Sequence, residues 1–415
     1  MLLLATAATL LSPSGQTDPV ALRAAALLDV ERGVVIEDAL VIVEGKEILA
    51  AGARATVALP ENARVQDLGD LTLLPGLIDA HVHLAWGASA PAPGAPLVGA
   101  DEALATLRAG FTTVRNLGST GLADLRLREA IDAGRVPGPR MIAAGPALGA
   151  PGGTCDGVFA GEAVVRDADE ARAKVRELAE QGAGVIKFCA GGGVLATAAD
   201  AESCELAPEI QRAIVEEAHA RGLRVAAHAQ GPRAILVAVQ AGVDSIEHGS
   251  LLDEASARAM QERGVVLVPT LYRLEWQLAN AEQVGAPVDA LARLEQASEL
   301  AFAAATLAAK LGVPIACGTD ATVVPHGLNA GELSALVRIG LTPAQAVRAA
   351  TLDAARLLGL EREIGSLSPG KRADVIAVTG NPLEDVSALQ RVVWVMKDGG
   401  IVKDTRAAGE ETQPR

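Results

Sequence analysis

Short apolar runs recur through the middle of the chain, and most of the segments between them have the apolar spacing of amphipathic helices. Eight such runs occur, at residues 73–84, 111–118, 140–148, 184–190, 223–229, 243–249, 265–271 and 313–321. Eight strand–helix units over about 250 residues predict an α/β fold, a (β/α)8 TIM-like barrel. A doubly wound open sheet is the weaker alternative, because the chain has no GxGxxG motif.

Helix start and stop signals lie between these runs. The segments from Asp167 to Gly182, from Glu205 to Gly222 and from Asp253 to Gly264 each combine an acidic first turn with a terminal glycine. Thr342 and Pro343 supply an N-cap and a first-turn proline for one helix, which we expect to end at Gly359. The spacing thus predicts helices that alternate with the strands.

The two ends of the chain have a different, β-rich character. Short strand-like runs separated by glycines and charged turns occur before the first barrel run and again near the C-terminus. We therefore expect residues 16–72 and 361–405 to form one small composite β-sandwich domain. The barrel, residues 73–360, would be inserted between them, and residues 406–415 would form a tail.

The N-terminal segment, residues 1–15, contains the apolar run MLLLATAATLL, which has the length of a signal-peptide core but no preceding basic residue. Two interpretations stay open. The run is an export signal, which would place the protein in the periplasm or outside the cell, or it is an apolar tail on a cytoplasmic protein. No apolar stretch of about 18 residues occurs, so we expect no membrane span.

Composition narrows the classes of partner. The 415 residues include 36 basic and 51 acidic ones, for a net charge of −15, which argues against nucleic-acid binding. Half of the residues are hydrophobic, which excludes an intrinsically disordered chain. Only 2% are aromatic, so Ala, Leu and Val must supply most of the core. A small molecule is the expected partner.

The four cysteines show no zinc-binding spacing and no CxxC pair. Cys189 and Cys317 lie inside apolar runs, so we expect both to be buried and inert. Cys155 and Cys204 lie in loop-like sequence. If the protein is exported, those two are the candidate disulfide pair.

Polar, chemistry-bearing residues fall at the ends of the predicted strands. They are His81, His83, Lys187, His228, His248 and Asp320. The C-terminal ends of barrel strands meet at one mouth, and residues 81 and 83 share one strand face. A single histidine in a strand is more often a hydrogen-bonded core residue, but this combined set predicts a metal site. Lys187 is either paired with a carboxylate or has lost its charge to act as a ligand.

The motifs PGLIDAHVHL, GVIKF, AAHA, SIEHG and GTDA resemble the amidohydrolase superfamily. The sequence looks closest to the imidazolonepropionase-like branch, which includes metal-dependent Xaa-Pro dipeptidases (prolidases). The resemblance covers nearly the whole chain. It implies a hydrolase of amide or peptide bonds whose ligand set is specific for the superfamily and much less specific for the substrate.

The resemblance also implies a two-zinc site. His81, His83 and Asp320 would hold one Zn²⁺, and His228 and His248 the other. Lys187, carboxylated by CO₂, would bridge the two ions together with a hydroxide. Two metals would acidify the bridging water and polarise the scissile carbonyl. Asp320 would be the catalytic residue that takes the proton of the hydroxide and delivers it to the leaving amine.

Candidate substrate-binding residues carry a weaker signal. Tyr272 and Arg273 follow the seventh run, and two interpretations are open: they face the substrate and bind a carboxylate, or they are rim residues without a role. His326 resembles a loop residue near the substrate in the family. Gln230 stands where relatives often have Tyr or His, and this difference bears on any transfer of peptidase specificity.

Three functions remain in view. The first is a binuclear zinc hydrolase of dipeptides, N-acyl amino acids or amide-linked small molecules. The second is a mononuclear deaminase or imidazolonepropionase-like ring-opening hydrolase, against which Lys187 counts. The third is a non-catalytic barrel scaffold. Relatives are often homo-oligomers, although the sequence predicts no subunit number.

Overall fold

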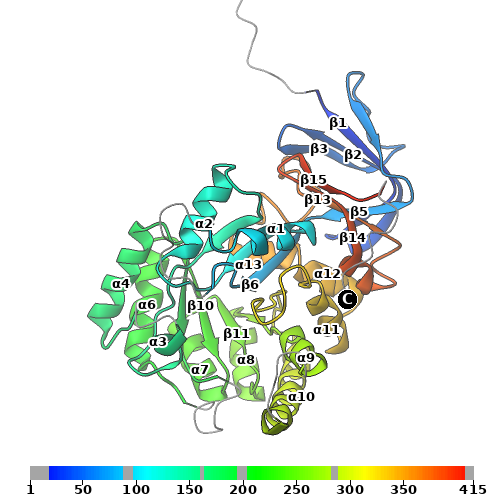
Figure 1. The fold of residues 1–415 in the computed structure, drawn as a ribbon. Coiled ribbons are helices and arrows are strands. Elements are labelled where there is room, and N and C mark those ends of the chain that lie inside the picture. Colours follow the sequence, from blue (N-terminus) through cyan, green and yellow to red (C-terminus); the bar gives the residue numbers. More distant parts are fainter. Residues whose placement is uncertain (1–17, 87–96, 159–162, 194–202, 282–287, 407–415) are drawn as a thin grey trace, which may run out of the picture.

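The computed structural model describes residues 18–86, 97–158, 163–193, 203–281 and 288–406 (Figure 1). The apolar segment at residues 1–15 lies outside the described residues, so its role as an export signal stays a prediction. Most of the tail at residues 406–415 lies outside them as well. No helix in the part of the chain that is described is long and apolar enough to cross a bilayer.

Strands from both ends of the chain form one sheet, and they lie side by side in Figure 1 in blue and red. Its order is β15-β14-β13-β5-β1-β2-β3, with β4 paired to β1. The antiparallel pairing of β13 with β5 joins the C-terminal strands to the N-terminal ones. The strands are β1 (Val20–Asp29), β2 (Val34–Glu44), β3 (Glu47–Ala53), β4 (Arg64–Asp67), β5 (Leu71–Pro75), β13 (Val375–Thr379), β14 (Val392–Lys397) and β15 (Gly400–Asp404).

Buried side chains from both ends, among them Leu22, Leu73 and Trp394, pack together in one core of this sheet. A short 3-10 helix, η1 (Val386–Arg391), connects β13 to β14. The strand pairing gives one continuous sheet. The two-layer sandwich and the domain boundaries at residues 72 and 361 therefore stay predictions.

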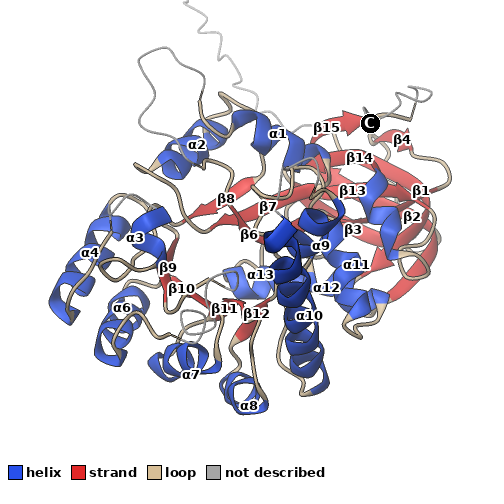
Figure 2. Cartoon of the chain, turned by 60° about the horizontal axis from the view of Figure 1, so that its bottom comes forward, coloured by secondary structure: helices blue, strands red, loops and turns tan. Residues whose placement is uncertain are grey.

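The middle of the chain alternates strands with helices, which confirms the α/β class (Figure 2). One parallel sheet has the order β6-β7-β8 and another the order β12-β11-β10-β9. In Figure 2 the helices α4, α6, α7 and α8 lie outside the strands β9–β12. These strands are β6 (Leu77–Val82), β7 (Phe111–Asn116), β8 (Arg140–Ala143), β9 (Val185–Cys189), β10 (Arg224–Ala229), β11 (Ser245–His248) and β12 (Val266–Val268).

The helices cover the outside of these strands and bury mainly small apolar side chains. Ala and Val dominate the buried face of the longer helices, as the low aromatic content requires. The helices are α1 (Ala100–Arg108), α2 (Ala123–Asp132), α3 (Thr154–Val158), α4 (Ala168–Glu180), α6 (Pro208–Ala220), α7 (Pro232–Ala241), α8 (Glu254–Arg263), α9 (Tyr272–Ala279), α10 (Val288–Lys310), α11 (Gly331–Arg338), α12 (Pro343–Ala349) and α13 (Leu352–Leu358).

Isolated bridges join the edges of the two parallel sheets. Leu148 pairs with Phe188, Leu267 with Ile315, and Val82 with Ala321. The eighth apolar run, 313–321, forms no strand among the described elements. In the middle of the chain, the described strands therefore form two parallel sheets, and single β-bridges link the edges of these sheets.

Most helix predictions are confirmed by the caps. The side chain of Asp167 accepts hydrogen bonds from the backbone at the start of α4, and Asp253 forms a capping box at the start of α8. The helix predicted from Glu205 begins only at Pro208, which supplies the first-turn proline of α6.

The single helix predicted from Thr342 to Gly359 is wrong, because two helices, α12 and α13, occupy this segment. The carbonyl groups of Ala349 and Ala350 accept hydrogen bonds from Cys317 and Ile78 in the strand region. These contacts take the carbonyls away from the helical pattern, so the helix ends there and a new one starts after Thr351.

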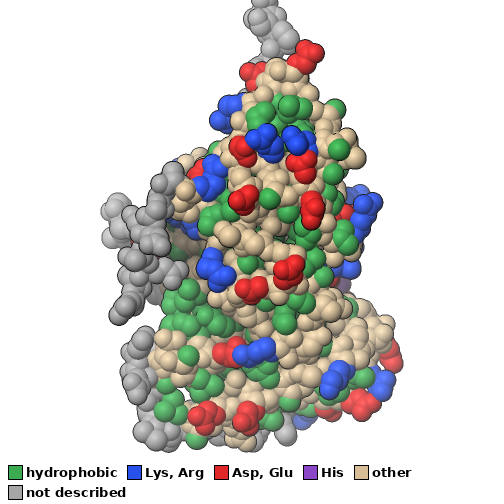
Figure 3. Space-filling model, turned by 90° about the vertical axis from the view of Figure 1, so that its right-hand side faces the viewer, with side chains coloured by type: hydrophobic (Ala, Val, Ile, Leu, Met, Phe, Trp, Pro, Cys, Tyr) green, Lys and Arg blue, Asp and Glu red, His purple; other side chains and the backbone are tan. Residues whose placement is uncertain are grey.

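Charged side chains of both signs are interspersed on the face drawn in Figure 3. Exposed ion pairs among the described residues include Arg258 with Glu254 and Arg135 with Glu129. Pairs of this kind contribute at most about 1 kcal/mol each.

Candidate metal centre

A cavity of about 290 Å³ opens at the C-terminal ends of the parallel strands. It brings together all six residues predicted as metal ligands, which lie far apart in the sequence. The cavity is lined by His81, His83, Trp86, Leu117, Thr154, Cys155, Lys187, Cys189, Gly193, His228, Gln230, His248, Arg273 and Asp320.

His81, His83 and Asp320 form one half of the centre. His81 belongs to β6, His83 follows directly after it, and Asp320 ends the eighth apolar run. The Nε2 atoms of His81 and His83 lie 3.6 and 3.3 Å from the same Oδ1 of Asp320. One ligand atom from each residue fits within 4.8 Å of the others, which is a spacing suitable for a shared cation.

His228, His248 and Lys187 form the other half. Their strands β10, β11 and β9 are neighbours in one parallel sheet, so the three side chains emerge at one edge. The rings of His228 and His248 have centroids 4.7 Å apart, and the ring of His248 lies 5.1 Å from that of His81. The two halves therefore meet at His248 and His81.

Each histidine has one ring nitrogen committed to a protein oxygen. The Nδ1 atoms pair with the Glu247 carboxylate for His81, the Gly118 carbonyl for His83 and the Thr270 hydroxyl for His248. For His228 it is Nε2 that donates to the Gly192 carbonyl, at 3.3 Å. The opposite nitrogen of each ring would be the metal ligand, which is the usual arrangement of histidine ligands in proteins. For His81 and His83 this nitrogen is Nε2, which lies beside Asp320.

A buried ion pair supports His81. Glu247 accepts from Nδ1 of His81 at 2.7 Å and from Nη2 of Arg115 at 2.9 Å, and all three side chains are no more than 1% exposed. Burial alone would raise the pKa of Glu247, but Arg115 and His81 outweigh it and lower that pKa to about 2. Glu247 is thus an anion that fixes the tautomer of His81.

A second buried carboxylate fixes the backbone beneath the centre. Asp79 of β6 accepts from the backbone of His81 and Thr319, from the Thr319 hydroxyl and from the Asn329 amide, at 2.6–3.1 Å. Burial raises the pKa of Asp79 to about 6, against these hydrogen bonds. The network ties β6 to the segment that carries Asp320.

Three residues of the site have left-handed backbone conformations. The φ angles are +72° for His248, +52° for Thr270 and +54° for Asp320. Such angles are unfavourable for residues other than glycine and cluster at functional sites. Gly318 lies so close to His81 that a Cβ atom there would overlap Val268 and His81, so only glycine brings Asp320 beside the histidines.

Burial favours the protonation states that metal binding needs. Desolvation, followed by the charge of Lys187, lowers the pKa of His81 to about 4, and desolvation lowers the pKa of His228 to about 3. Burial also lowers the pKa of Lys187 to about 8. Neutral imidazoles and a readily deprotonated amine fit a site for divalent cations.

Lys187 is 4% exposed, and none of the described residues forms an ion pair or hydrogen bond with its amine. The sequence left two roles open for this lysine, and the described part of the structure provides no carboxylate partner within bonding distance. A buried amine without a partner is costly unless it is neutral or modified.

The predicted substrate residues separate into two groups. Arg273 and Gln230 line the cavity, and Nε of Arg273 lies 3.4 Å from Oδ2 of Asp320. Tyr272 packs instead against Gly331 of α11, where a Cβ atom would overlap its ring. His326 lies near His83, and its Nδ1 atom is 3.3 Å from the Thr106 hydroxyl. It is not among the described residues that line the cavity.

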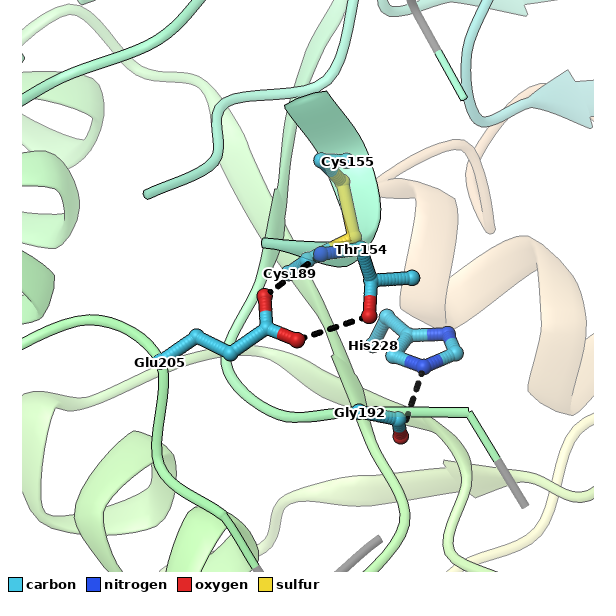
Figure 4. The surroundings of a disulfide bond; sticks show 6 residues. All are labelled: Thr154, Cys155, Cys189, Gly192, Glu205 and His228. Carbon is cyan, nitrogen blue, oxygen red and sulfur yellow. Dashed lines mark hydrogen bonds between the residues drawn. A yellow bond between two sulfur atoms is a disulfide. The ribbon is translucent and has the colours of Figure 1, made fainter. Parts of the chain in front are cut away.

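The predicted pairing of Cys155 with Cys204 is wrong, because Cys155 forms a disulfide with Cys189 (Figure 4). The expectation that Cys189 is inert is wrong for the same reason. Leu148 and Phe188 form a bridge that brings the loop after β8 against β9, whereas Cys204 bonds locally to Leu206 and Gln211. Cys317 is a free, buried thiol, as expected.

The residues that hold the ligands in place were not predicted from the sequence. They are above all Arg115, Glu247, Asp79 and Thr270. A signal existed for two of them. Arg115 and Glu247 are opposite charges inside apolar strand-like runs, and buried charges are normally paired. The roles of Asp79 and Thr270 depend on contacts that no local pattern predicts.

The sequence model of the Amidohydrolase family matches residues 72–402 of this chain. An ochratoxinase from Aspergillus niger is 32% identical over 412 residues, covering 89% of this chain and 84% of that protein. An imidazolonepropionase from Deinococcus radiodurans is 30% identical, covering 85% and 88%. A crystal structure of a Xaa-Pro dipeptidase with methionine bound in the active site has a TM-score of 0.83 at 33% identity, covering 92% and 99%.

Proposed function

We propose that this chain, which belongs to the amidohydrolase family and hydrolyses carbon–nitrogen bonds, is a binuclear zinc enzyme for small amide substrates. The observation that carries the proposal is the position of Lys187. Its amine lies among four histidines and Asp320, and no described residue pairs with it. The described donors fit two cations. His81, His83 and Asp320 would hold one, His228 and His248 the other, and Lys187 would bridge them.

Lys187 needs a chemical change to take this part. Its neutral amine attacks CO₂, a C–N bond forms and one N–H proton is released, which leaves a carbamate anion. Burial, which lowers the pKa of Lys187 to about 8, increases the fraction of neutral amine near neutral pH. The carbamate would supply two anionic oxygens where an ammonium would repel the cations.

When bound, the metals supply Lewis acidity that polarises the amide carbonyl and lowers the pKa of water. Asp320 would take a proton from the attacking water. The closeness of its carboxylate to His81, His83 and Arg273 in the cavity lining supports this role. The same carboxyl then protonates the leaving amine. Its pKa stays well below the usual value because Arg273 and the histidines outweigh the effect of burial.

Arg273 supports a substrate that bears a carboxylate. Its side chain is 15% exposed and lines the cavity, so its guanidinium is available for a charged hydrogen bond. Dipeptides and N-acyl amino acids carry such a group next to the amide. Gln230 lines the same cavity and would contact the substrate as well. Roles for Tyr272 and His326 in substrate binding remain predictions.

The fold proposal is a closed (β/α)8 barrel over residues 73–360. The three bridges that link the sheet edges, at Leu148, Leu267 and Val82, support it. The likeness to the Xaa-Pro dipeptidase structure over 92% of the chain supports it as well. Whether the protein is exported or cytoplasmic stays open.

A mononuclear ring-opening hydrolase is the second candidate, because an imidazolonepropionase is among the relatives at 30% identity. Such an enzyme has no need for Lys187. Metal stoichiometry therefore separates the two candidates, with about two ions per chain for the first and about one for the second.

The test is to measure metal per chain by plasma mass spectrometry, together with hydrolysis of dipeptides and N-acyl amino acids. The protein is expressed with added zinc and bicarbonate. We expect about two metals in the wild type, and a loss of metal and at least about 10²-fold lower kcat/KM in Lys187→Ala. A short carboxylic acid should restore part of the activity, since it can replace the carbamate oxygens.

Lys174→Ala is the matched control, because Lys174 lies on α4 outside the cavity lining and pairs with Glu177. It should keep full metal and activity. Full metal and full activity in Lys187→Ala would show that the bridging role is wrong. One metal per chain in active wild type would favour the ring-opening enzyme.

A further inference from the structure

The Cys155–Cys189 disulfide lies in the wall of the cavity that Lys187 also lines. Figure 4 shows the disulfide together with Thr154 and His228. Cys189 follows Lys187 by two positions on β9, so the pleat places both side chains on the same face of the strand. Both cysteines and Thr154 line the cavity together with Lys187 and His228. The disulfide is therefore part of the surface that faces a bound substrate.

The loop that carries Cys155 is also held by other contacts. The backbone N–H and the hydroxyl of Thr154 donate to the Glu205 carboxylate at 2.9 and 2.7 Å, as Figure 4 shows. At the base of the loop, Leu148 donates to the carbonyl of Lys187 and accepts from Cys189. Cleavage of the disulfide would thus leave both sulfur atoms near each other, which allows the bond to form again.

Access to the two sulfur atoms is restricted. Cys155 is 1% exposed and Cys189 4% exposed, and both border the cavity of about 290 Å³. A reagent that reaches them through this cavity enters the space that the substrate occupies. Cys204 is half-buried outside the cavity lining, and Cys317 is completely buried, so neither offers the same route.

We propose that Cys155–Cys189 is a redox modification site, reduced by low-molecular-weight thiols that enter the substrate cavity, and that the oxidised form is the efficient enzyme. A reagent thiolate attacks one sulfur, the S–S bond breaks, and the other cysteine leaves as a thiolate and takes up a proton. A second reagent thiol then releases the first cysteine. The two electrons come from the reagent, which becomes its own disulfide.

Reduction changes the wall because two thiols require a larger sulfur–sulfur separation than a covalent bond. The start of α3, which carries Thr154 and Cys155, must shift relative to β9, and the substrate-facing surface shifts with it. Misplacement of groups around a substrate by about 1 Å can cost up to about 10²-fold in rate. The expected loss of activity uses the amide hydrolysis proposed above as its assay, whereas the thiol chemistry does not depend on it.

The experiment treats the folded, metal-loaded protein with reduced glutathione, removes the reagent and counts thiols after denaturation. Two thiols should be found before treatment, from Cys204 and Cys317, and four afterwards. Alkylation and peptide mapping identify the new ones. We expect kcat/KM to fall by about 10- to 100-fold at unchanged metal content, and to recover with oxidised glutathione.

Two variants sharpen the test. The double variant C155A/C189A should have the low kcat/KM of the reduced protein and no response to glutathione. The control Cys204→Ser removes a free thiol and should respond as the wild type does. If the double variant does not fold, the reversible reduction of the wild type by glutathione still tests the proposal.

A thiol count that stays at two in the folded protein overturns the proposal, and so does an unchanged kcat/KM in fully reduced, metal-loaded protein. If the oxidised protein hydrolyses none of the amides, the proposed function fails instead. In that case, the appearance of free thiols at Cys155 and Cys189 in the folded protein tests the modification site independently of the amide assay.

Discussion

The two halves of the metal centre are held in different ways. Behind His81, His83 and Asp320 lies a buried network of charges, in which Arg115, Glu247 and Asp79 connect several strands. Behind His228 and His248 the described hydrogen-bond partners are the Gly192 carbonyl and the Thr270 hydroxyl. The first half is therefore positioned by the Glu247 carboxylate at His81 and by the neutral Gly118 carbonyl at His83, whereas the described partners in the second half are all neutral.

This difference leads us to expect that the two halves would bind their metal ions in different ways. Three-donor geometry exists in the described structure for His81, His83 and Asp320. In the proposed two-metal site, the second half would need Lys187 as well, with its amine converted to a carbamate anion. We therefore expect the first metal to bind tightly to a preformed set of ligands, and the second to depend on CO₂ and on the first.

The largest expected effect comes from removing the cation of the charged half. Arg115→Met would leave the Glu247 carboxylate buried without its ion pair, and also removes a hydrogen bond to the carbonyl of Ala80. Breaking one partner of a buried pair costs about 3–5 kcal/mol. Denaturant unfolding of the metal-free protein measures this loss.

The double variant R115M/E247Q is the control for that experiment. It removes both charges, so it should recover part of the lost stability, although the hydrogen bonds to Ala80 and Ser245 stay lost. A decrease of less than about 1 kcal/mol in Arg115→Met would mean that the charged half is not the stabilising one.

The next effect compares the two halves directly through their outer hydrogen bonds. Glu247→Gln keeps the shape but removes the charge behind His81, and Thr270→Val removes the hydroxyl behind His248 while keeping a β-branched side chain. We expect about 10- to 100-fold weaker zinc binding in the first variant and a smaller loss in the second. Competition with a chelating dye measures both. Equal losses would contradict the division into charged and neutral halves.

Much of this site was predictable, and the reason is local. The histidines, Lys187 and Asp320 each end a run whose apolar character is visible in the sequence, so strand ends and ligands could be located together. The supporting residues were not predictable in this way. The hydrogen bond between Asp79 and Asn329 spans 250 residues, and only the folded chain brings the two together.

The errors have the same origin. The disulfide partner of Cys155 depends on how the loop after β8 crosses β9, which local sequence does not determine. The break between α12 and α13 depends on carbonyls that bond to residues 78 and 317. Caps were predictable at α4 and α8 because a cap involves only neighbours in sequence.

A third prediction tests the substrate side of the charged half. Arg273→Met removes the guanidinium that lies beside Asp320 and lines the cavity. For a substrate with a free carboxylate we expect KM to rise by about 10- to 100-fold, since a charged hydrogen bond is worth about 1.5–3 kcal/mol. For the same substrate as its amide the change should be small. A similar increase for both substrates would show that Arg273 acts on Asp320 and not on the carboxylate.

The smallest expected effect, measured over one pH unit, concerns a buried carboxyl that has no cation partner among the described residues, in contrast to Glu247. Glu332 of α11 accepts from the backbone N–H groups of Leu271 and Tyr272 at 3.0 and 2.7 Å. Burial raises its pKa to about 8 from an ordinary value of 4.5, against those two hydrogen bonds. Between these two values the folded protein keeps a proton that the unfolded chain has released.

Stability should therefore fall as the pH rises from about 4.5 to about 8, by at most about 1.4 kcal/mol per pH unit from this group, and level off above. Glu332→Gln cannot release a proton, so its unfolding free energy should lose this part of the pH dependence, whatever its absolute stability. Chemical unfolding of metal-free protein at pH 6 and 7 measures the difference. Glu254→Gln, which removes an exposed ion-pair partner of Arg258 on α8, should keep the wild-type slope. Identical slopes in Glu332→Gln and wild type would mean that the two backbone N–H groups stabilise the Glu332 anion as fully as Arg115 stabilises Glu247.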